Sequence, residues 1–316
     1  MEREGPPTGP QGRLRRRRPH DPHLSGGLVG GAVDLHSHTT ASDGSLAPRE
    51  LVRLAVKHGV RVLAITDHDS TDALAEAMDE ARHHPPLQIV PGLEINCDVP
   101  GRGNGGPAEI HVLGYSVDWE AAWFQQFLSE QRAERRQRVY RMAERLAELG
   151  MPIDPAEVLA LARDGSAGRP HIAQVMVNRG YVASVREAFD RYLRAGGPAN
   201  VPRKRLTPAD AVAVIRRARG VPVLAHPGLA GRDDLIPDLT RAGLMGIETY
   251  YPEHSTAQTA TYLELCRRHD LVATGGSDYH GPHLGKAAHP GTPAIPLAVW
   301  EALRARAAQA RGGSAS

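Results

Sequence analysis

Seven short apolar runs, most of them rich in β-branched residues, recur along this chain, and helical patterns separate most of them. The runs cover residues 32–35, 60–66, 88–95, 110–117, 221–225, 246–250 and 271–274. Strands that alternate with helices predict a parallel sheet with helices on its faces. Seven such strands favour a closed or nearly closed barrel, with one strand fewer than is usual. We therefore expect an α/β fold, a distorted seven-stranded (β/α)7 barrel.

Residue types at several predicted helix ends support this alternation. The helix over 48–58 begins with Pro48 and is followed by Gly59, and Thr207 is a plausible cap for a helix that ends at Gly220. Proline at the first helical position and glycine just past the last one are frequent boundaries. The predicted strands and helices therefore have defined ends.

The stretch from about 118 to 202 interrupts the alternation. It begins with a long predicted helix over 119–149, and Asp154 and Ser184 then head two further capping patterns. Because this stretch follows a barrel strand, we expect it at the catalytic end, as a lid or a substrate-recognition subdomain. The expected organisation is a disordered Arg/Pro-rich tail over 1–30, a first barrel part over 31–118, the helical insertion over 119–203, and a second barrel part over 204–311.

Charge and cysteine content narrow the setting. The formal net charge of +2 does not require a nucleic-acid partner, although an RNA-binding arm is the alternative for the arginine-rich tail. The cysteines, Cys97 and Cys266, argue against a disulfide scaffold and a cysteine zinc site, and favour a reducing compartment. No run is apolar enough for a membrane span or a secretion signal. We expect a cytoplasmic protein with no membrane contact and no obligate protein partner.

Histidines and carboxylates gather where the predicted strands end. His36 and His38 are two residues apart, so in extended chain they point to the same side and can share one metal ion. The other candidates of this kind are Asp43, His68, Glu94, His111, His226, Asp278 and His280. Each has an ordinary explanation when taken singly, but the carboxyl ends of parallel barrel strands meet around one pocket. The nine residues together predict one site.

The composition of this set indicates its chemistry. Imidazole and carboxylate without thiolate suit Mn, Fe or Zn, and nine potential ligands are too many for one ion. Two or three metal ions sharing a bridging carboxylate fit better. Such a site neutralises phosphate oxygens and lowers the pKa of bound water, which favours in-line attack on a phosphate ester. No nucleophile-elbow motif is present, so serine-based acyl transfer is not supported.

In order along the chain, the strings DLHSHTTASDGS, ITDHDS, PGLEI, IHVLGY, AHPG and GGSDYHG resemble the PHP (polymerase and histidinol phosphatase) superfamily, from about Val33 to about Gly285. The resemblance implies a distorted seven-stranded barrel with a trinuclear metal centre, with Mn²⁺ the first candidate and Fe²⁺ or Zn²⁺ as alternatives. By matching position, one ion would be held by His36, His38, Glu94 and Asp278, a second by Glu94, His111 and His226, and a third by Asp43, His68 and His280.

Asp43, where some members have histidine, and the long insertion resemble the branch of the family that acts on nucleotides. That branch includes 3′,5′-nucleoside bisphosphate phosphatases, and it is related to enzymes that trim short RNA from the 5′ end. The resemblance implies hydrolysis of a nucleotide phosphate monoester, most simply the 3′-phosphate of a 3′,5′-bisphosphate, by a hydroxide that bridges the metals.

Substrate contacts are expected from the insertion and its flanks. Gly168 to His171 resembles that branch's substrate-binding segment, and Arg169 and His171 near a helix start could hold a second phosphate. Arg135 and Lys204 are further candidates. A solvated face is the simpler interpretation of the arginines on the long helix, including Arg132, Arg135 and Arg138.

Three other functions stay open at this point. A PHP phosphatase could act on another small ester such as histidinol phosphate, which Asp43 and the insertion disfavour. A non-hydrolytic metal- or nucleic-acid-binding module would be expected to lack some of the ligands, and here every position is filled. An amidohydrolase also begins with His-x-His at a strand end, but the strings TDHD and SDYH fit that family poorly.

Overall fold

The structure is a computed structural model that describes Met1 and residues 31–101, 108–162, 165–202, 206–282 and 289–312. The predicted tail up to residue 30, apart from Met1, and the candidate Lys204 lie outside the described residues.

Seven strands form one sheet in which spatial order follows chain order, β1 to β7. The amide of Leu35, next to β1, donates to the carbonyl of Gly275 in β7 at 3.1 Å, and Ser37 bridges to Tyr279 in parallel. These contacts bring the first and last strands together, so the sheet is nearly closed and the predicted distorted seven-stranded barrel is confirmed. The strands are β1 (Val33–Asp34), β2 (Val62–Ile65), β3 (Gln88–Val99), β4 (Ala108–Tyr115), β5 (Val221–Leu224), β6 (Gly246–Tyr250) and β7 (Val272–Gly275).

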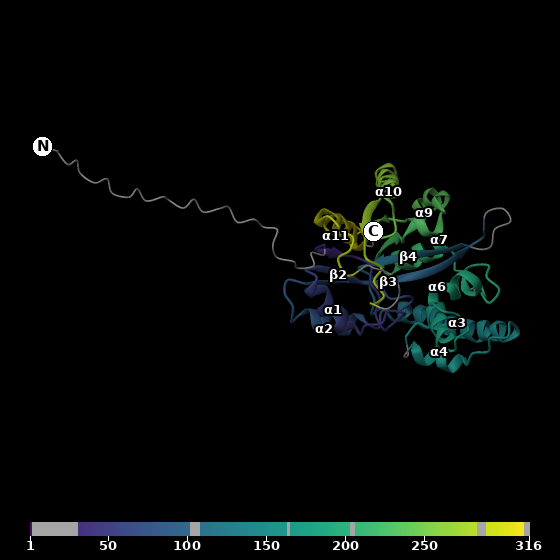
Figure 1. The fold of residues 1–316 in the computed structure, drawn as a ribbon. Helices are drawn as coiled ribbons and strands as arrows, with labels where there is room; N and C mark the ends of the chain where they lie inside the picture. Colours follow the sequence, from purple (N-terminus) through teal and green to yellow (C-terminus); the bar gives the residue numbers. More distant parts are fainter. Residues whose placement is uncertain (2–30, 102–107, 163–164, 203–205, 283–288, 313–316) are drawn as a thin grey trace.

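The expectation of an all-parallel sheet is wrong at β4, which runs antiparallel to both β3 and β5. The stretch between Val99 and Ala108 is too short for the crossover helix that parallel neighbours need. Strands β3 and β4 therefore pair as a long antiparallel ribbon, visible in Figure 1. The reversal places the first half of β4, with His111, beside the later residues of β3, where Ile95 pairs with Val112.

The two faces of the strands separate the barrel interior from its helical coat. In β2, Val62 and Ala64 contribute to the interior cluster, whereas Leu63 and Ile65 pack in the cluster of helices α1 and α2. Interior positions on the strands are apolar at one end of the barrel, and helix α11 packs against them. Polar residues replace them further along: on β3, Glu94 occupies the same face as Val90. The apolar layer therefore supports a polar layer above it.

Helices of the barrel surround this sheet (Figure 1). The predicted starts of two of them are confirmed: Pro48 is the first residue of α1, and Thr207 caps α7 by accepting from the amide of Asp210 at 3.2 Å. None of the described helices is both long and apolar enough to cross a membrane. They are α1 (Pro48–Lys57), α2 (Leu74–Ala81), α7 (Pro208–Arg217), α8 (Pro227–Ala230), η2 (Asp233–Leu235), α9 (Ile236–Ala242), α10 (Thr256–His269) and α11 (Leu297–Gly312).

Between β4 and β5 lie α3 (Ala122–Glu148), α4 (Pro155–Leu161), α5 (Arg169–Asn178), α6 (Val185–Ala188) and the π-helix η1 (Phe189–Leu193), drawn in teal in Figure 1. The first half of α3 packs on the barrel through Phe124 and Leu128. Its second half forms a separate apolar cluster with α4, α5 and α6. Helix α3 therefore joins two cores, while the domain boundaries given above stay predictions.

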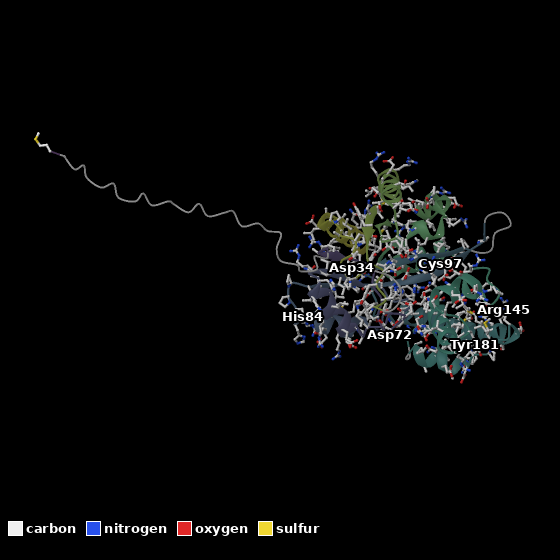
Figure 2. The ribbon with its side chains drawn as sticks, in the orientation of Figure 1. Asp34, Asp72, His84, Cys97, Arg145 and Tyr181 are labelled. Atoms are coloured by element: carbon white, nitrogen blue, oxygen red, sulfur yellow. The ribbon has the colours of Figure 1, made fainter. Side chains whose placement is uncertain are left out.

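Side-chain hydrogen bonds also tie the loops of this insertion to α3 and to one another. Arg145 of α3 donates to the carbonyl of Asn200, and the hydroxyl of Tyr181 donates to the carbonyl of Pro152 at 3.0 Å. Both Arg145 and Tyr181 are labelled in Figure 2, on the side of the molecule that the insertion occupies.

The insertion core predicts a stability difference between Leu146 of α3 and Leu149, which directly follows this helix. Leu146 is fully buried in the second cluster, so Leu146→Ala should lower the free energy of unfolding by about 2–5 kcal/mol. Leu149, 44 % exposed, is the matched control, and Leu149→Ala should change it by less than about 0.5 kcal/mol. Equal effects in chemical denaturation would contradict this packing.

Candidate metal centre

All nine predicted site residues lie together at one end of the barrel. His36 and His38 follow β1, His68 follows β2, and Glu94 and His111 lie on β3 and β4. The others, Asp43, His226, Asp278 and His280, come from the segments after β1, β5 and β7. Gly276 permits the close approach of the last segment, because a Cβ there would lie 2.3 Å from the backbone nitrogen of His36.

Four of these side chains converge on one point at the base of the site. The Nε2 atoms of His36 and His38 are 3.1 Å apart, and each lies 3.3 Å from Oε2 of Glu94. Oδ1 of Asp278 is 3.4 Å from the first nitrogen and 3.2 Å from the second. Ligand atoms held about 2.0–2.2 Å from one ion lie roughly 3–3.5 Å from one another. This donor set therefore fits a divalent cation.

Glu94 contributes both of its carboxylate oxygens. Oε1 lies 2.7 Å from Nδ1 of His111 and 3.0 Å from Nε2 of His226, while Oε2 also lies 3.1 Å from Nδ1 of His68. The side chain is 1 % exposed. One buried carboxylate is thus shared among five imidazoles from four segments, as a bridging ligand would be.

Asp43 centres a third group. Its Oδ1 lies 3.3 Å from Nε2 of His280, and its Oδ2 lies 3.6 Å from Nε2 of His68. Among the described residues, the buried atoms Oδ1 of Asp43 and Nδ1 of His68 make no hydrogen bond. Buried polar atoms are rarely left unsatisfied, so this group too fits a bound cation.

The site raises the pKa of two of its histidines and lowers the pKa of one of its carboxyl groups. Burial alone would lower the pKa of His38, but Asp278 and Glu94 raise it to about 9. Burial would also lower the pKa of His111, but Glu94 and Glu109 raise it to about 9. Burial would raise the pKa of Asp43, yet His68 and His280 hold it well below its usual range. Carboxylates and imidazoles thus stabilise one another's charged forms.

A second layer of side chains orients these groups, and the sequence interpretation did not assign it. Glu248 of β6, fully buried, accepts from Nδ1 of His36 at 2.9 Å and from the backbone amide of His226 at 2.8 Å. The hydroxyl of Tyr251 donates to Asp278 at 2.9 Å. Such partners fix the orientation of metal ligands. Glu248 shows the same sequence signal as Glu94, a carboxylate within an apolar strand.

The backbone also turns sharply just after several of the strands that carry the site. Asp69, His226 and Asp278 have positive φ angles of 49°, 23° and 49°. Such angles are uncommon for residues with a side chain and cluster at functional sites.

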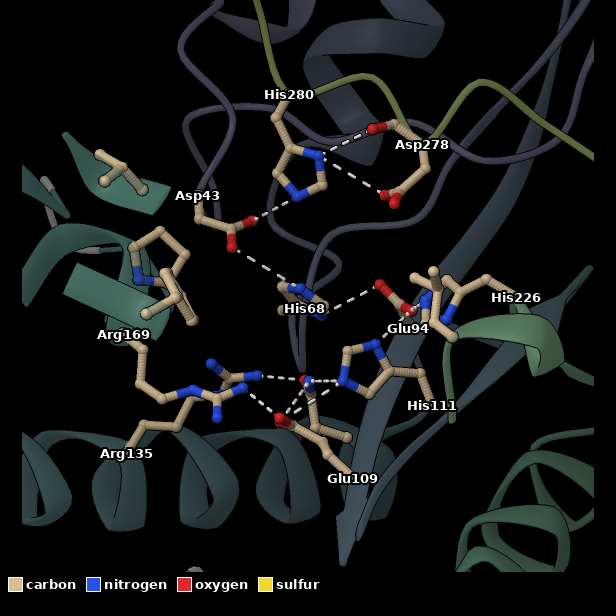
Figure 3. A pocket seen from close by; sticks show the side chains of 16 residues that line it. Asp43, His68, Glu94, Glu109, His111, Arg135, Arg169, His226, Asp278 and His280 are labelled. Carbon is tan, nitrogen blue, oxygen red and sulfur yellow. Dashed lines mark hydrogen bonds and ion pairs between the residues drawn. The ribbon is translucent and has the colours of Figure 1, made fainter. Parts of the chain in front are cut away.

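Above the ligands lies a cavity of about 290 Å³, shown in Figure 3. Seven of the nine predicted residues line it, whereas His36 and His38 lie beneath at 0 % and 1 % exposure. The lining also includes residues of the insertion, so barrel and insertion enclose it jointly. The further lining residues are Asn96, Glu109, Arg135, Gly168, Arg169, Pro170, Val185, Phe189 and Leu229.

The solvated-face interpretation of the α3 arginines is wrong for Arg135 and Arg138, which are 5 % and 6 % exposed. Nε of Arg135 donates to Asp69 at 2.6 Å, and its Nη2 donates to Asn96. Arg138 donates to the carbonyl of Val201 at 2.6 Å. Both guanidinium groups lie between the two cores that α3 joins, where water cannot replace these partners.

The other proposed substrate contacts differ in position. Arg169 lines the cavity, where it forms an ion pair with Glu109 and lies 5.4 Å above the ring of Phe189. Nδ1 of His171 accepts from the amide of Gly168 at 3.1 Å, at the start of α5, and is not among the residues that line the cavity. The substrate-binding roles of Arg169, His171, Arg135 and Lys204 stay predictions.

Known proteins agree with this fold and site. The PHP domain family matches residues 34–201. A 5′-3′ exoribonuclease, Rnm, of Escherichia coli is 36 % identical over 79 % of this chain and 85 % of its own. A phosphoribosyl 1,2-cyclic phosphate 1,2-diphosphodiesterase of Eggerthella lenta is 34 % identical over 80 % and 97 %. A 3′,5′-nucleoside bisphosphate phosphatase of Chromobacterium violaceum is 31 % identical over 87 % and 97 %.

A solved structure from Bifidobacterium adolescentis, described as a metal-dependent phosphoesterase, superposes with a TM-score of 0.77 at 30 % identity and covers 87 % of this chain and 96 % of its own. The chain therefore belongs to the PHP family and is a metal-dependent phosphoesterase. The individual ligands, the number of ions and the identity of the metal stay predictions.

The raised pKa values predict proton release on metal binding. Because the pKa values of His38 and His111 are about 9, both rings carry an extra proton at pH 7.5 in the metal-free protein. A cation needs the free ring nitrogen, so binding should displace protons and the affinity should rise with pH. Calorimetric titration with Mn²⁺ at pH 7.5, in buffers of different ionisation enthalpy, should give different apparent enthalpies. Identical enthalpies in all buffers would refute it.

Proposed function

We propose that this protein hydrolyses a phosphate monoester of a nucleotide, most simply the 3′-phosphate of a nucleoside 3′,5′-bisphosphate. The observation that carries the proposal is the shared cavity: metal-ligand candidates form one side, and Arg169 and apolar residues of the insertion form the other. A bisphosphorylated nucleoside presents matching groups, namely a reacting phosphate, a second phosphate and an apolar base. We include the trimming of short RNA from the 5′ end in the proposal, because one relative is named for that activity.

The donor sets fit two or three divalent ions, with Mn²⁺ the first candidate, held by the three overlapping groups around Glu94, Asp43 and Asp278. When bound, such ions neutralise phosphate oxygens and lower the pKa of water. Glu248 and Tyr251 would keep the ligands in place. Arg169 would hold the second phosphate, because its planar guanidinium suits bidentate contact. Arg135 would add positive charge from beneath, fixed by Asp69.

The insertion side of the cavity gives a nucleobase an apolar surface. Pro170, Val185 and Phe189 of the insertion line it, together with Leu229 of the barrel helix α8. Aromatic rings stack on bases of any type. This surface supports a nucleotide over histidinol phosphate, which has no comparably large base.

The relatives leave a second candidate reaction. The Eggerthella lenta relative is named for a cyclic phosphodiester of phosphoribose, which carries no base. The same metal-ligand candidates could serve a diester or a monoester. The two reactions are therefore separated by whether turnover requires a nucleobase on the substrate. A non-hydrolytic binding module is disfavoured by the family and by the presence of every predicted ligand residue in one site.

Phosphate release from adenosine 3′,5′-bisphosphate tests the proposal. The protein loaded with Mn²⁺ should release inorganic phosphate, and His226→Ala should lower kcat/KM by more than about 100-fold, because even partners of ligands are worth about 10- to 100-fold. His83→Ala, an exposed histidine of the same chemistry, should behave like the parent. No release from any nucleotide phosphate, despite measured metal occupancy, would overturn the proposed substrate class and direct the search to histidinol phosphate and cyclic sugar phosphates.

The apolar wall predicts a base-dependent effect of Phe189. Replacing it by Leu keeps apolar volume but removes stacking, which is worth about 1–3 kcal/mol per base. Phe189→Leu should therefore raise KM for adenosine 3′,5′-bisphosphate at least about 5-fold and leave KM for the base-free analogue ribose 3,5-bisphosphate unchanged. Tyr192→Leu is the matched control, because Tyr192 lies in the same π-helix but does not line the cavity. Equal changes on both substrates would exclude a stacking role.

A further inference from the structure

Glu109 is an acidic side chain in a cavity that we assign to a phosphate substrate, and neither the proposed metal sites nor the substrate contacts use it. It lies on β4 two residues before His111, so both side chains leave the same face of the strand. Its side chain is 15 % exposed and lines the cavity. A carboxylate here would repel phosphate unless other groups neutralise it.

The two oxygens of Glu109 face different parts of the site, as Figure 3 shows. Oε1 lies 3.4 Å from Nε2 of His111, whose Nδ1 lies 2.7 Å from Glu94. Oε2 pairs with Nη2 of Arg169, at the first residue of α5. The carboxylate therefore joins a metal-ligand candidate on the barrel to a cation on the insertion.

Neighbouring groups limit the partners available to Glu109 and His111. Nδ2 of Asn96 lies 2.6 Å from Nε2 of His111 and donates to Oε1 of Glu109 at 3.4 Å, while its Oδ1 accepts from Arg135. Since a guanidinium only donates, Arg135 keeps the oxygen of Asn96 turned away from His111. When Nδ1 binds a cation, Nε2 of His111 carries the proton and must donate; the amide nitrogen of Asn96 cannot accept this hydrogen bond, whereas the carboxylate of Glu109 can.

Arg169 depends on Glu109 in a similar way. Among the described residues, its other contacts are the carbonyl of Leu193, to which Nη1 donates at 3.3 Å, and the ring of Phe189. Neither partner is charged. The ion pair with Glu109 therefore fixes the guanidinium at the cavity wall.

We propose that Glu109 is a positioning residue for two groups at once: one oxygen orients the His111 ring toward the metal centre, and the other holds Arg169 where it meets the second phosphate of the substrate. Carboxylate partners of metal-bound histidines fix ring orientation and are worth about 10- to 100-fold in metal affinity. The inference concerning Arg169 rests on the proposed function. The link to His111 rests only on the metal centre.

The test uses Glu109→Ala and the isosteric Glu109→Gln in the full chain. Equilibrium dialysis with Mn²⁺, without substrate, should show at least one site weakened about 10- to 100-fold in Glu109→Ala. KM should rise more for adenosine 3′,5′-bisphosphate than for adenosine 3′-monophosphate, because only the former carries a phosphate for Arg169. Glu109→Gln has one acceptor oxygen and can serve only His111 or Arg169. It should therefore still show at least one of the two defects, weaker Mn²⁺ binding or the raised KM. Glu264→Ala, which removes the exposed partner of Arg267 on α10, should match the parent in both assays.

Unchanged Mn²⁺ affinity in both Glu109 variants would overturn the link to His111. Equal KM changes on the bisphosphate and the monophosphate would overturn the link to Arg169. If the parent hydrolyses no nucleotide, the proposed function fails, whereas the dialysis measurement still decides the role of Glu109 toward the metal centre.

Discussion

The site depends on the buried carboxylate of Glu94. Its two oxygens lie within 3.3 Å of ring nitrogens from five histidines on four different segments of the barrel. Burial would raise the pKa of this carboxyl, but His111, His68 and His36 hold it well below its usual range. An isolated buried carboxylate would cost several kcal/mol, so this one requires the positive charge that the surrounding histidines or bound metal ions supply. The barrel serves to bring those four segments to Glu94 on β3.

Much of this arrangement could be predicted from the sequence, because strand ends in a barrel converge wherever they fall in the chain. Short β-branched runs gave the seven strands, and the histidines and carboxylates at their ends gave the nine clustered residues. The order of the motifs gave the family, which the match over residues 34–201 confirms. Glu248 carried the same signal as Glu94, a carboxylate in an apolar strand, and could have been found by the same reasoning.

Two features depended on contacts that a local pattern does not contain. The direction of β4 follows from the short connection after β3, whereas alternation alone suggested a parallel strand. The burial of Arg135 follows from its place on the stripe of α3 that includes Leu128 and Met142, seven residues away on either side. That stripe faces the barrel at one end and the insertion core at the other. An arginine between two cores can be buried because Asp69 neutralises it.

The most direct test of this account is a crystal structure of the protein loaded with Mn²⁺, with anomalous diffraction recorded to locate the ions. We expect two or three ions in the cluster, one of them between His36, His38 and Asp278, with Glu94 coordinating two ions through its separate oxygens. A single ion, or ions that Glu94 does not bridge, would contradict the shared-carboxylate centre from which the proposed chemistry follows.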